Sequence, residues 1–443
     1  MTRPWRASAA VVGVAVIGWC GWTASAHPRI STSLTWRADI EPLFARQCGA
    51  CHGASASATA APTAMPIAAA AAAIASSSLP LSTYADVRPW AAAIREEVLE
   101  RRMPPAHARP GLDPGVDDHP LSPMERDLIV AWIDGGAPEG QPGAPPTAAF
   151  WCPMHPEIRA DQPGACPLCD MPLSAFAPDL TRRYTWSFQP PAITSPGRPH
   201  RVMFSITERP GSISEHPIAG QHSRTTTRTG TPVRRFERVH EHPLHLFVVS
   251  EDFSSFEHVH PTPPSDADPD ARWSMSWRPP ARGRYWFYAD FLPIGGPPQL
   301  LQRVITVGDA AAGPHAAPAR STASARETRV AVSGGVEATL TAPPLRAGDE
   351  HRLTIDLRDA ATQSPVTDLE LYLGAWGHLF VLHEQRDEAL HAHPDAEATI
   401  AKGPGLAFDV LFPRAGTYYL WTQVSRRGAI VTLPFVLRVL PRA

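Results

Sequence analysis

Short runs of alternating apolar and polar residues dominate the second half of the chain, and turn-forming residues separate them. Alternation with a period of two is typical of strands that bury one face, and many such runs at close spacing predict a β-sandwich. We therefore expect two all-β sandwiches. The predicted strands are 201–207, 244–250, 273–277, 285–291 and 302–307 in the first, and 329–342, 352–358, 377–383, 406–411, 416–423 and 430–439 in the second.

Helical periodicity characterises the beginning of the chain instead. Apolar residues at helical spacing predict helices over 36–53, 88–102 and 123–134. Ser122 is a suitable N-cap for the third helix, and Glu125 completes a capping box. The chain is therefore predicted to be multidomain, with an N-terminal all-α domain over 30–142 that is interrupted by a low-complexity insertion at 54–80.

The helical segment contains the motif Cys48-Gly-Ala-Cys51-His52. C-x-x-C-H is the attachment sequence of c-type haem, in which both thiols bond to the porphyrin and the histidine ligates the iron. Met103, held between a helix and two prolines, is the predicted sixth ligand. A methionine that merely packs at the helix end is the alternative, and His107 and His119 are competing ligands.

Four stretches of this segment resemble a class of periplasmic and planctomycete-type cytochrome c domains. They are 48–53, 84–90, 102–105 and 131–140. The resemblance implies an all-α cytochrome c domain with one covalent haem c and a role in electron transfer. Ligation by histidine and methionine would raise the reduction potential and favour electron transfer over oxygen chemistry.

A second motif, C-x2-H-x10-C-x2-C, lies in a short segment at 148–176. It is formed by Cys152, His155, Cys166 and Cys169. Two such pairs can build a tetrahedral site for zinc or copper, and so short a segment needs a metal to hold its fold. A disulfide-stapled loop is the alternative. The segment resembles the heavy-metal-binding domain of copper and silver efflux adaptors and P-type ATPases.

An internal repeat organises the remainder of the chain. A constant offset of 133 positions relates His245 to His378, and the H-x-H-P motif at 258–261 to the one at 391–394. The offset indicates two copies of one domain, at 198–308 and 329–443, joined by a linker at 309–328. The predicted ligands of copper or zinc are His245, His258 and His260 in the first copy, and His378, His391 and His393 in the second.

Alternation along a strand points both histidines of each H-x-H to one face, which favours a metal site. The alternative is that these histidines only pack near a turn. His240 and His242 form a further H-x-H in the first copy alone. Tyr285 and Tyr418, each at the start of a late strand, resemble the tyrosine corner of immunoglobulin-like folds. The repeat also resembles β-sandwich modules of exported proteins linked to copper handling.

Basic residues, an apolar run and Ala-Ser-Ala at the beginning of the chain predict a signal peptide over 1–26 and a periplasmic or exported protein with no membrane span after cleavage. An uncleaved anchor is the alternative. The formal net charge of −3 argues against nucleic acid as a partner. A periplasmic redox partner or a metal efflux or delivery protein fits better.

These features favour a periplasmic haem protein for electron transfer that also binds a heavy metal, such as copper, in metal homeostasis or detoxification. The first alternative is a haem/copper oxidoreductase with a catalytic His-bound metal. The second is a metal-independent binding module whose histidines are incidental.

Overall fold

The structure is a computed structural model in which residues 32–443 form one compact unit. It describes residues 34–53, 79–105, 121–141, 150–188, 195–209, 230–308 and 326–442, except for 154, 156, 168–170, 176–177 and 396–397. The predicted signal peptide, His107, His119, Cys169 and most of the insertion and the linker lie outside the described residues.

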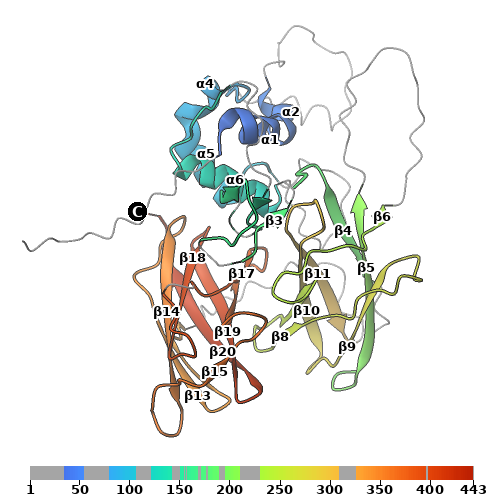
Figure 1. Ribbon diagram of the computed structural model, residues 1–443, viewed down its shortest axis with the longest axis vertical. Helices are drawn as coiled ribbons and strands as arrows, with labels where there is room; N and C mark the ends of the chain where they lie inside the picture. Colours follow the sequence, from blue (N-terminus) through green and yellow to red (C-terminus); the bar gives the residue numbers. More distant parts are fainter. Residues whose placement is uncertain are drawn as a thin grey trace, which may run out of the picture. The chain divides into compact units, whose positions relative to one another are not determined.

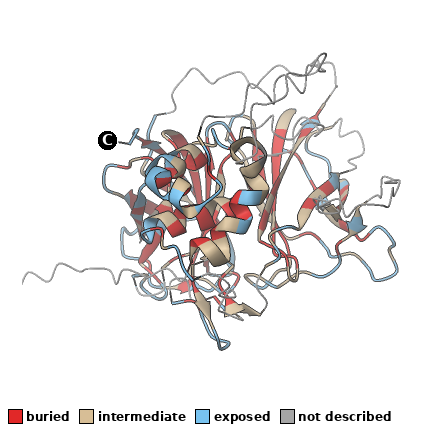
Figure 2. Cartoon of the chain, turned by 90° about the horizontal axis from the view of Figure 1, so that it is seen from above, coloured by how far each residue is buried: buried red, intermediate tan, exposed pale blue. Residues whose placement is uncertain are grey.

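Short helices make up the first part of the described chain (Figure 1). A capping box formed by Ser122 and Glu125 starts the longest of them, α6, as predicted. Buried and exposed residues alternate around the longer helices α5 and α6, so each of these two has one face toward the protein core (Figure 2). The helices are η1 (Trp36–Ile40), α1 (Glu41–Gln47), α2 (Gly49–His52), α4 (Tyr84–Val87), η2 (Arg88–Trp90), α5 (Ala91–Leu99) and α6 (Pro123–Asp134).

The prediction of a separate all-α cytochrome c domain is wrong. Strands dominate the described chain, and the helices share a hydrophobic core with two residues of the strand-bearing part, Trp151 and Leu292. Glu125 of α6 is also paired with Arg183, at the start of a strand. Isolated short helices are marginally stable, so these helices are stabilised by burying a face against their β neighbours.

The first sandwich contains one sheet in the order β11-β10-β7-β8 and a second in the order β4-β5-β6, in which β9 also pairs with β5. Its core holds large aromatic residues such as Trp186, Phe204 and Trp273. The strand β4 precedes residue 198, where the sandwich was expected to begin. The strands are β4 (Arg183–Phe188), β5 (His200–Arg209), β6 (Thr231–Pro232), β7 (His245–Ser250), β8 (Phe256–Val259), β9 (Arg272–Trp277), β10 (Gly283–Phe291) and β11 (Gln299–Val307).

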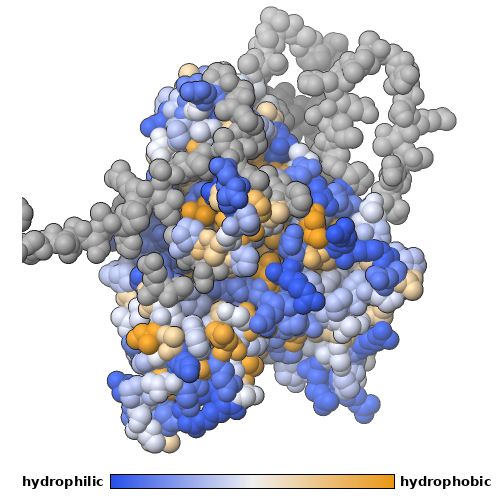
Figure 3. Space-filling view, viewed as in Figure 1, coloured by the Kyte–Doolittle hydropathy of each residue, from blue (hydrophilic) through white to orange (hydrophobic). Residues whose placement is uncertain are grey.

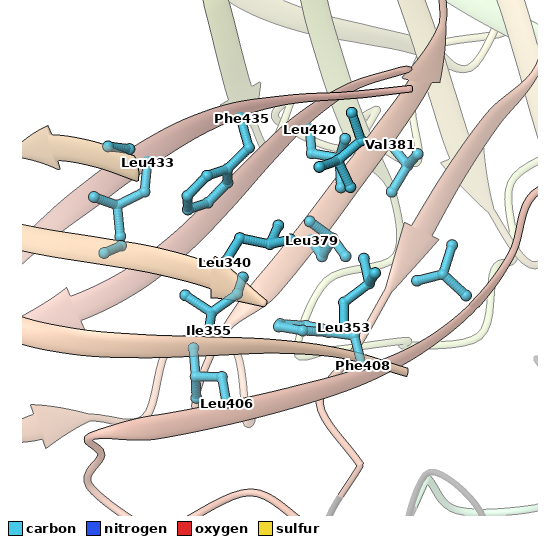
Figure 4. Close-up of a cluster of buried hydrophobic side chains, with 14 of the residues drawn as sticks. Leu340, Leu353, Ile355, Leu379, Val381, Leu406, Phe408, Leu420, Leu433 and Phe435 are labelled. Carbon is cyan, nitrogen blue, oxygen red and sulfur yellow. The ribbon is translucent and has the colours of Figure 1, made fainter. Parts of the chain in front are cut away.

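The second sandwich has one sheet in the order β12-β13-β14-β18 and another in the order β15-β19-β16-β17, with β20 added beside β19. Mainly aliphatic residues from both sheets fill its core, together with aromatic residues such as Phe408 and Phe435 (Figure 4). The strands are β12 (Val330–Ser333), β13 (Val336–Thr341), β14 (Glu350–Asp359), β15 (Leu369–Glu370), β16 (His378–His383), β17 (Ala389–Ala392), β18 (Gly405–Leu411), β19 (Gly416–Arg426) and β20 (Ala429–Val439).

The equivalent strands β7 and β16 are buried on both faces, unlike a strand with one solvent face. One face of each strand packs into its own sandwich core. The other face packs against the opposite sandwich, where the rings of Phe247 and Phe380 stack with their centroids 4.2 Å apart. Phe247 and Phe380 are 133 positions apart, so the two copies meet through the same surface. This pseudo-twofold contact is called the inter-sandwich interface below.

Each sandwich has a tyrosine whose hydroxyl closes a loop. The Tyr418 hydroxyl donates to the Arg414 carbonyl oxygen at 2.9 Å and accepts from the Arg414 N–H at 3.3 Å. The Tyr285 hydroxyl makes the same two bonds with Ala281, at 2.9 and 3.1 Å. Arg414 is buried, whereas Ala281 is exposed.

We expect Tyr418→Phe to lower the free energy of unfolding by about 1–3 kcal/mol, because the buried Arg414 backbone loses its partner. Tyr285→Phe should cost less, since water can satisfy Ala281. Urea denaturation of both variants checks this, and equal losses would contradict the role given to burial.

On the face seen in Figure 3, hydrophobic residues are interspersed with hydrophilic ones. Within the described ranges, no helix combines the length and the apolar character needed to cross a membrane.

Candidate metal centres

Six of the predicted histidines lie at the inter-sandwich interface, in two groups of three. His245 starts β7 on the same strand face as Phe247, which contacts the opposite sandwich. His258 lies on β8 and pairs with Phe247 in the sheet register, and His260 follows directly after this strand. The second group, His378, His391 and His393, occupies the equivalent places on and after β16 and β17. In each group the three ligand atoms lie within 4.8 Å of one another.

In the first group, the tautomers of His245 and His258 follow from the hydrogen bonds of the ring nitrogens that point away from the centre of the group. His245 Nε2 lies 2.9 Å from the Val239 carbonyl oxygen, and His258 Nδ1 lies 2.9 Å from Oε1 of Gln423. Both partners are acceptors, so these nitrogens carry the protons. The other two nitrogens, His245 Nδ1 and His258 Nε2, then face each other with lone pairs at 3.0 Å. His260 Nε2 lies 3.2 Å from the same His245 Nδ1.

The second group repeats this arrangement. His378 Nε2 lies 2.8 Å from the Tyr372 carbonyl oxygen, and His391 Nδ1 lies 2.9 Å from Oδ2 of Asp290. The inward nitrogens, His378 Nδ1 and His391 Nε2, are 3.2 Å apart. Both ring nitrogens of His393 are buried and have no hydrogen-bond partner among the described residues. Facing lone pairs and an unsatisfied imidazole are unfavourable unless a cation lies between them.

The separations fit a transition metal ion. With metal–nitrogen bonds of about 2.0–2.1 Å, two ligand nitrogens lie about 2.9 Å apart at a right angle and about 3.3 Å apart at the tetrahedral angle. The observed 3.0 and 3.2 Å lie between these limits. Three imidazoles can therefore coordinate one ion with little movement and leave a coordination position for another ligand.

Burial keeps these rings neutral. It lowers the pKa of His245 to about 4 and that of His378 to about 3. Burial, together with neighbouring histidines, also holds the pKa values of His258, His391 and His393 well below the ordinary value. Neutral imidazoles are the form that binds metal, so the ligands are available at neutral pH without loss of a proton.

A hairpin of the first sandwich extends over both groups. Val239 and His242 pair across a turn in which His240 and Glu241 have positive φ angles of 48° and 65°. The ring of His240 stacks on His393 with centroids 3.5 Å apart, and that of His242 stacks on His260 at 3.9 Å. The extra H-x-H therefore contributes one imidazole beside each group, although its motif alone did not assign it to either.

Asp290 and Gln423 are site residues that sequence reasoning missed. In the sheet register, Asp290 lies opposite His245 and Gln423 lies opposite His378, so each is paired with a histidine of the same copy. The side chain nevertheless reaches a histidine of the opposite copy. Burial raises the pKa of Asp290 to about 7. The offset of 133 relates the two positions, and a polar residue at the same place in both copies, within a mostly apolar predicted strand, was the available signal.

Three ligands of the Cys/His knuckle also meet. Sγ of Cys152 and Sγ of Cys166 lie 3.7 and 3.5 Å from Nδ1 of His155. A tetrahedral zinc site, with metal–sulfur bonds of about 2.3 Å, places sulfur and nitrogen about 3.6 Å apart. Backbone pairing among β1 (Phe150–Trp151), β2 (Arg159–Ala160) and β3 (Ser174–Ala175) supports the two loops. The predicted fourth ligand, Cys169, lies outside the described residues.

The proposed haem-attachment residues lie on one helical turn. The N–H of His52 donates to the carbonyl oxygen of Cys48, and Cys48 and Cys51 are not joined by a disulfide. His52 Nδ1 lies 2.9 Å from the carbonyl oxygen of Leu79. This bond places the proton on Nδ1 and the lone pair on Nε2, as iron ligation requires. The residues present therefore fit a covalently held haem.

Met103, the predicted sixth ligand, follows α5 and has 42% of its surface exposed. An exposed thioether does not by itself distinguish an iron ligand from a surface residue, so this assignment stays a prediction.

Comparison with known protein families identifies two regions. Residues 149–173, which hold the knuckle, match the family described as the heavy metal binding domain. Residues 211–308 and 330–440 match twice a domain of unknown function, DUF8832, so both three-histidine groups lie inside this repeated family. No curated protein matches the chain.

Among solved structures, a trypsin-activated alpha-2-macroglobulin from Escherichia coli is 13% identical, with a TM-score of 0.18 over 60% of this chain. The chain spans only 16% of that protein. The Escherichia coli adhesin FdeC is 11% identical with a TM-score of 0.17, covering 61% of this chain and 68% of the adhesin. Fibronectin(III)-like modules of Clostridium thermocellum CbhA are 11% identical, with a TM-score of 0.15 and coverages of 58% and 94%.

Proposed function

We propose that the protein is an exported metalloprotein that binds copper or zinc at two three-histidine sites and at the Cys/His knuckle, in metal homeostasis or detoxification. The main support is that two inward ring nitrogens face each other with their lone pairs in each group. These nitrogens are 3.0 Å apart in the first group and 3.2 Å apart in the second. A packing role would place a proton donor opposite an acceptor, whereas these tautomers leave two acceptors facing one another. The match of the knuckle to heavy-metal-binding domains supports the same conclusion.

The proposal includes one covalent haem c at Cys48 and Cys51, with His52 as an iron ligand. When bound, this group supplies reversible one-electron transfer. The chain's contribution is to hold His52 by its bond to Leu79 and to place the two thiols one turn apart. A periplasmic redox partner would exchange the electrons, and a metal efflux or delivery protein would exchange the ions.

The test is elemental analysis and a visible spectrum of the full chain exported to a bacterial periplasm. We expect bound copper or zinc at both histidine sites and at the knuckle, and a haem that stays attached after denaturation. Cys48→Ser with Cys51→Ser should lose the haem and keep the ions. A wild-type chain without stoichiometric copper or zinc would overturn the metal proposal, and haem released by denaturation would overturn the covalent attachment.

A haem/copper oxidoreductase is the second candidate. A cavity of about 30 Å³ beside the sites favours it, since this volume accommodates one molecule of the size of water or dioxygen next to the histidines. Its lining includes Pro153, His242, His245, Asp290, His391 and His393. Oxygen consumption with a reductant should then require copper, with the zinc-loaded chain as the control. Equal rates in the two forms would exclude this candidate.

A further inference from the structure

The two three-histidine sites differ in one charged group. His391 Nδ1 bonds Oδ2 of Asp290 at 2.9 Å, whereas the equivalent His258 Nδ1 bonds Oε1 of Gln423 at 2.9 Å. Asp290 and Gln423 occupy equivalent positions on β10 and β19. Both sites have three histidines, and in both a backbone carbonyl accepts from the histidine at the start of the strand, His245 or His378. The sites differ in the residue that contacts the next histidine, which is an acid for His391 and an amide for His258.

The amide orientation at Gln423 supports this distinction. Its Nε2 donates to Oγ1 of Thr432 at 3.0 Å, and its Oε1 faces the imidazole of His258 at 2.9 Å. Gln423 therefore offers His258 a neutral acceptor in a fixed geometry. Asp290 offers His391 a carboxyl oxygen in the same direction, and a cation bound by His391 favours the ionised form of this acid. Charge is therefore the main difference between the two metal-bound arrangements.

A carboxylate behind a ligating imidazole changes the metal as well as the ring. It draws the ring proton outward, makes the inward nitrogen a stronger donor and adds a negative charge to the site. The attraction between that charge and the ion doubles from a monovalent to a divalent ion. An amide orients the ring without adding charge.

We propose that Asp290 and Gln423 are positioning residues that give the two sites different ion preferences. The site of His378, His391 and His393 selects a divalent ion, Cu(II) or Zn²⁺. The site of His245, His258 and His260 has the smaller preference for divalent over monovalent ions and is the better place for Cu(I). This inference rests on the proposed function, since it assumes that both groups bind metal.

The test measures each site alone in the full chain. His245→Ala leaves the site with Asp290, and His378→Ala leaves the site with Gln423. Competition with chelators gives the Zn²⁺ affinity and, under anaerobic reducing conditions, the Cu(I) affinity of each. Because the knuckle also binds these ions, every variant carries Cys152→Ser and Cys166→Ser as a common background.

The two near-isosteric exchanges should act in opposite directions. Asp290→Asn should weaken Zn²⁺ binding by roughly 10–100-fold, the usual effect of an outer partner, and Cu(I) binding by a smaller factor. Gln423→Glu should strengthen Zn²⁺ binding at the other site more than Cu(I) binding. Unchanged Zn²⁺ to Cu(I) selectivity in both exchanges would overturn the inference. Absence of Zn²⁺ and Cu(I) binding in both single-site chains would instead overturn the proposed function.

Discussion

His378→Ala is expected to abolish one metal site and leave the other nearly intact. His378 Nδ1 faces His391 Nε2 at 3.2 Å, and its Nε2 is held by the Tyr372 carbonyl oxygen. Removing this imidazole leaves two ligands. The affinity of that site should therefore fall by more than the roughly 10–100-fold attributed to a supporting partner. Metal titration followed by elemental analysis of the full chain should show one ion fewer per chain.

The control is His351→Ala in the same sandwich. His351 is also buried, but its Nε2 lies near the backbone of Arg346, and His351 belongs to neither three-histidine group. We expect His351→Ala to lower the unfolding free energy and to keep the metal stoichiometry. Loss of an ion from both variants would show that the effect comes from damaged folding.

Glu125→Gln is expected to lower the free energy of unfolding by about 3 kcal/mol at pH 7. Glu125 is fully buried in α6 and lies 3.0 Å from Arg46 and 2.6 Å from Arg183. Glutamine can keep the capping bond to Ser122, so the exchange removes the charge and leaves two arginines without their carboxylate. Urea denaturation measures the loss.

The effect should depend on pH. Burial alone would raise the pKa of Glu125, but Arg183 and the hydrogen bonds from Ser122, Gln47 and Arg46 outweigh it and hold the pKa below 4.5. A carboxyl with a lowered folded-state pKa stabilises the fold above its unfolded pKa, and this contribution disappears as the pH falls through the folded pKa. The unfolding free energies of the wild type and Glu125→Gln should therefore converge in acid.

Glu139→Gln provides a matched comparison. Glu139 pairs with Arg37 at 2.8 Å, but about half of its side chain is exposed, at 45%. A surface pair contributes about 0–1 kcal/mol. A loss at Glu139 equal to that at Glu125, or a Glu125 effect that persists unchanged in acid, would contradict the buried-charge explanation.

The sequence predicts those features that depend on neighbouring positions. The offset of 133 identified both three-histidine groups, and the structure brings each group together within 4.8 Å. The cap at Ser122 follows from a local signal and is confirmed. Whether the groups bind metal is still a prediction. The short strands β8 and β17 were missed because His258 and His391, which are polar, occupy the strand face that packs against the opposite sandwich.

Long-range pairing was not predictable in the same way. Asp290 lies 101 positions from His391, and no local pattern relates an acid on one strand to a histidine of the other copy. The prediction of a separate helical domain was wrong for a similar reason. Their periodicity predicted which face is buried, but not that Trp151 and Leu292 would complete the core.

Asp290 and Gln423 each contact a histidine of the opposite copy at the inter-sandwich interface, and this arrangement also bears on the evolution of the chain. In a symmetric homodimer of a single sandwich, the residue behind the second histidine would be identical in both subunits. Asp290 and Gln423 can differ here because each copy has its own positions in one polypeptide. Carrying both copies in one polypeptide thus allows the two three-histidine groups to diverge from each other.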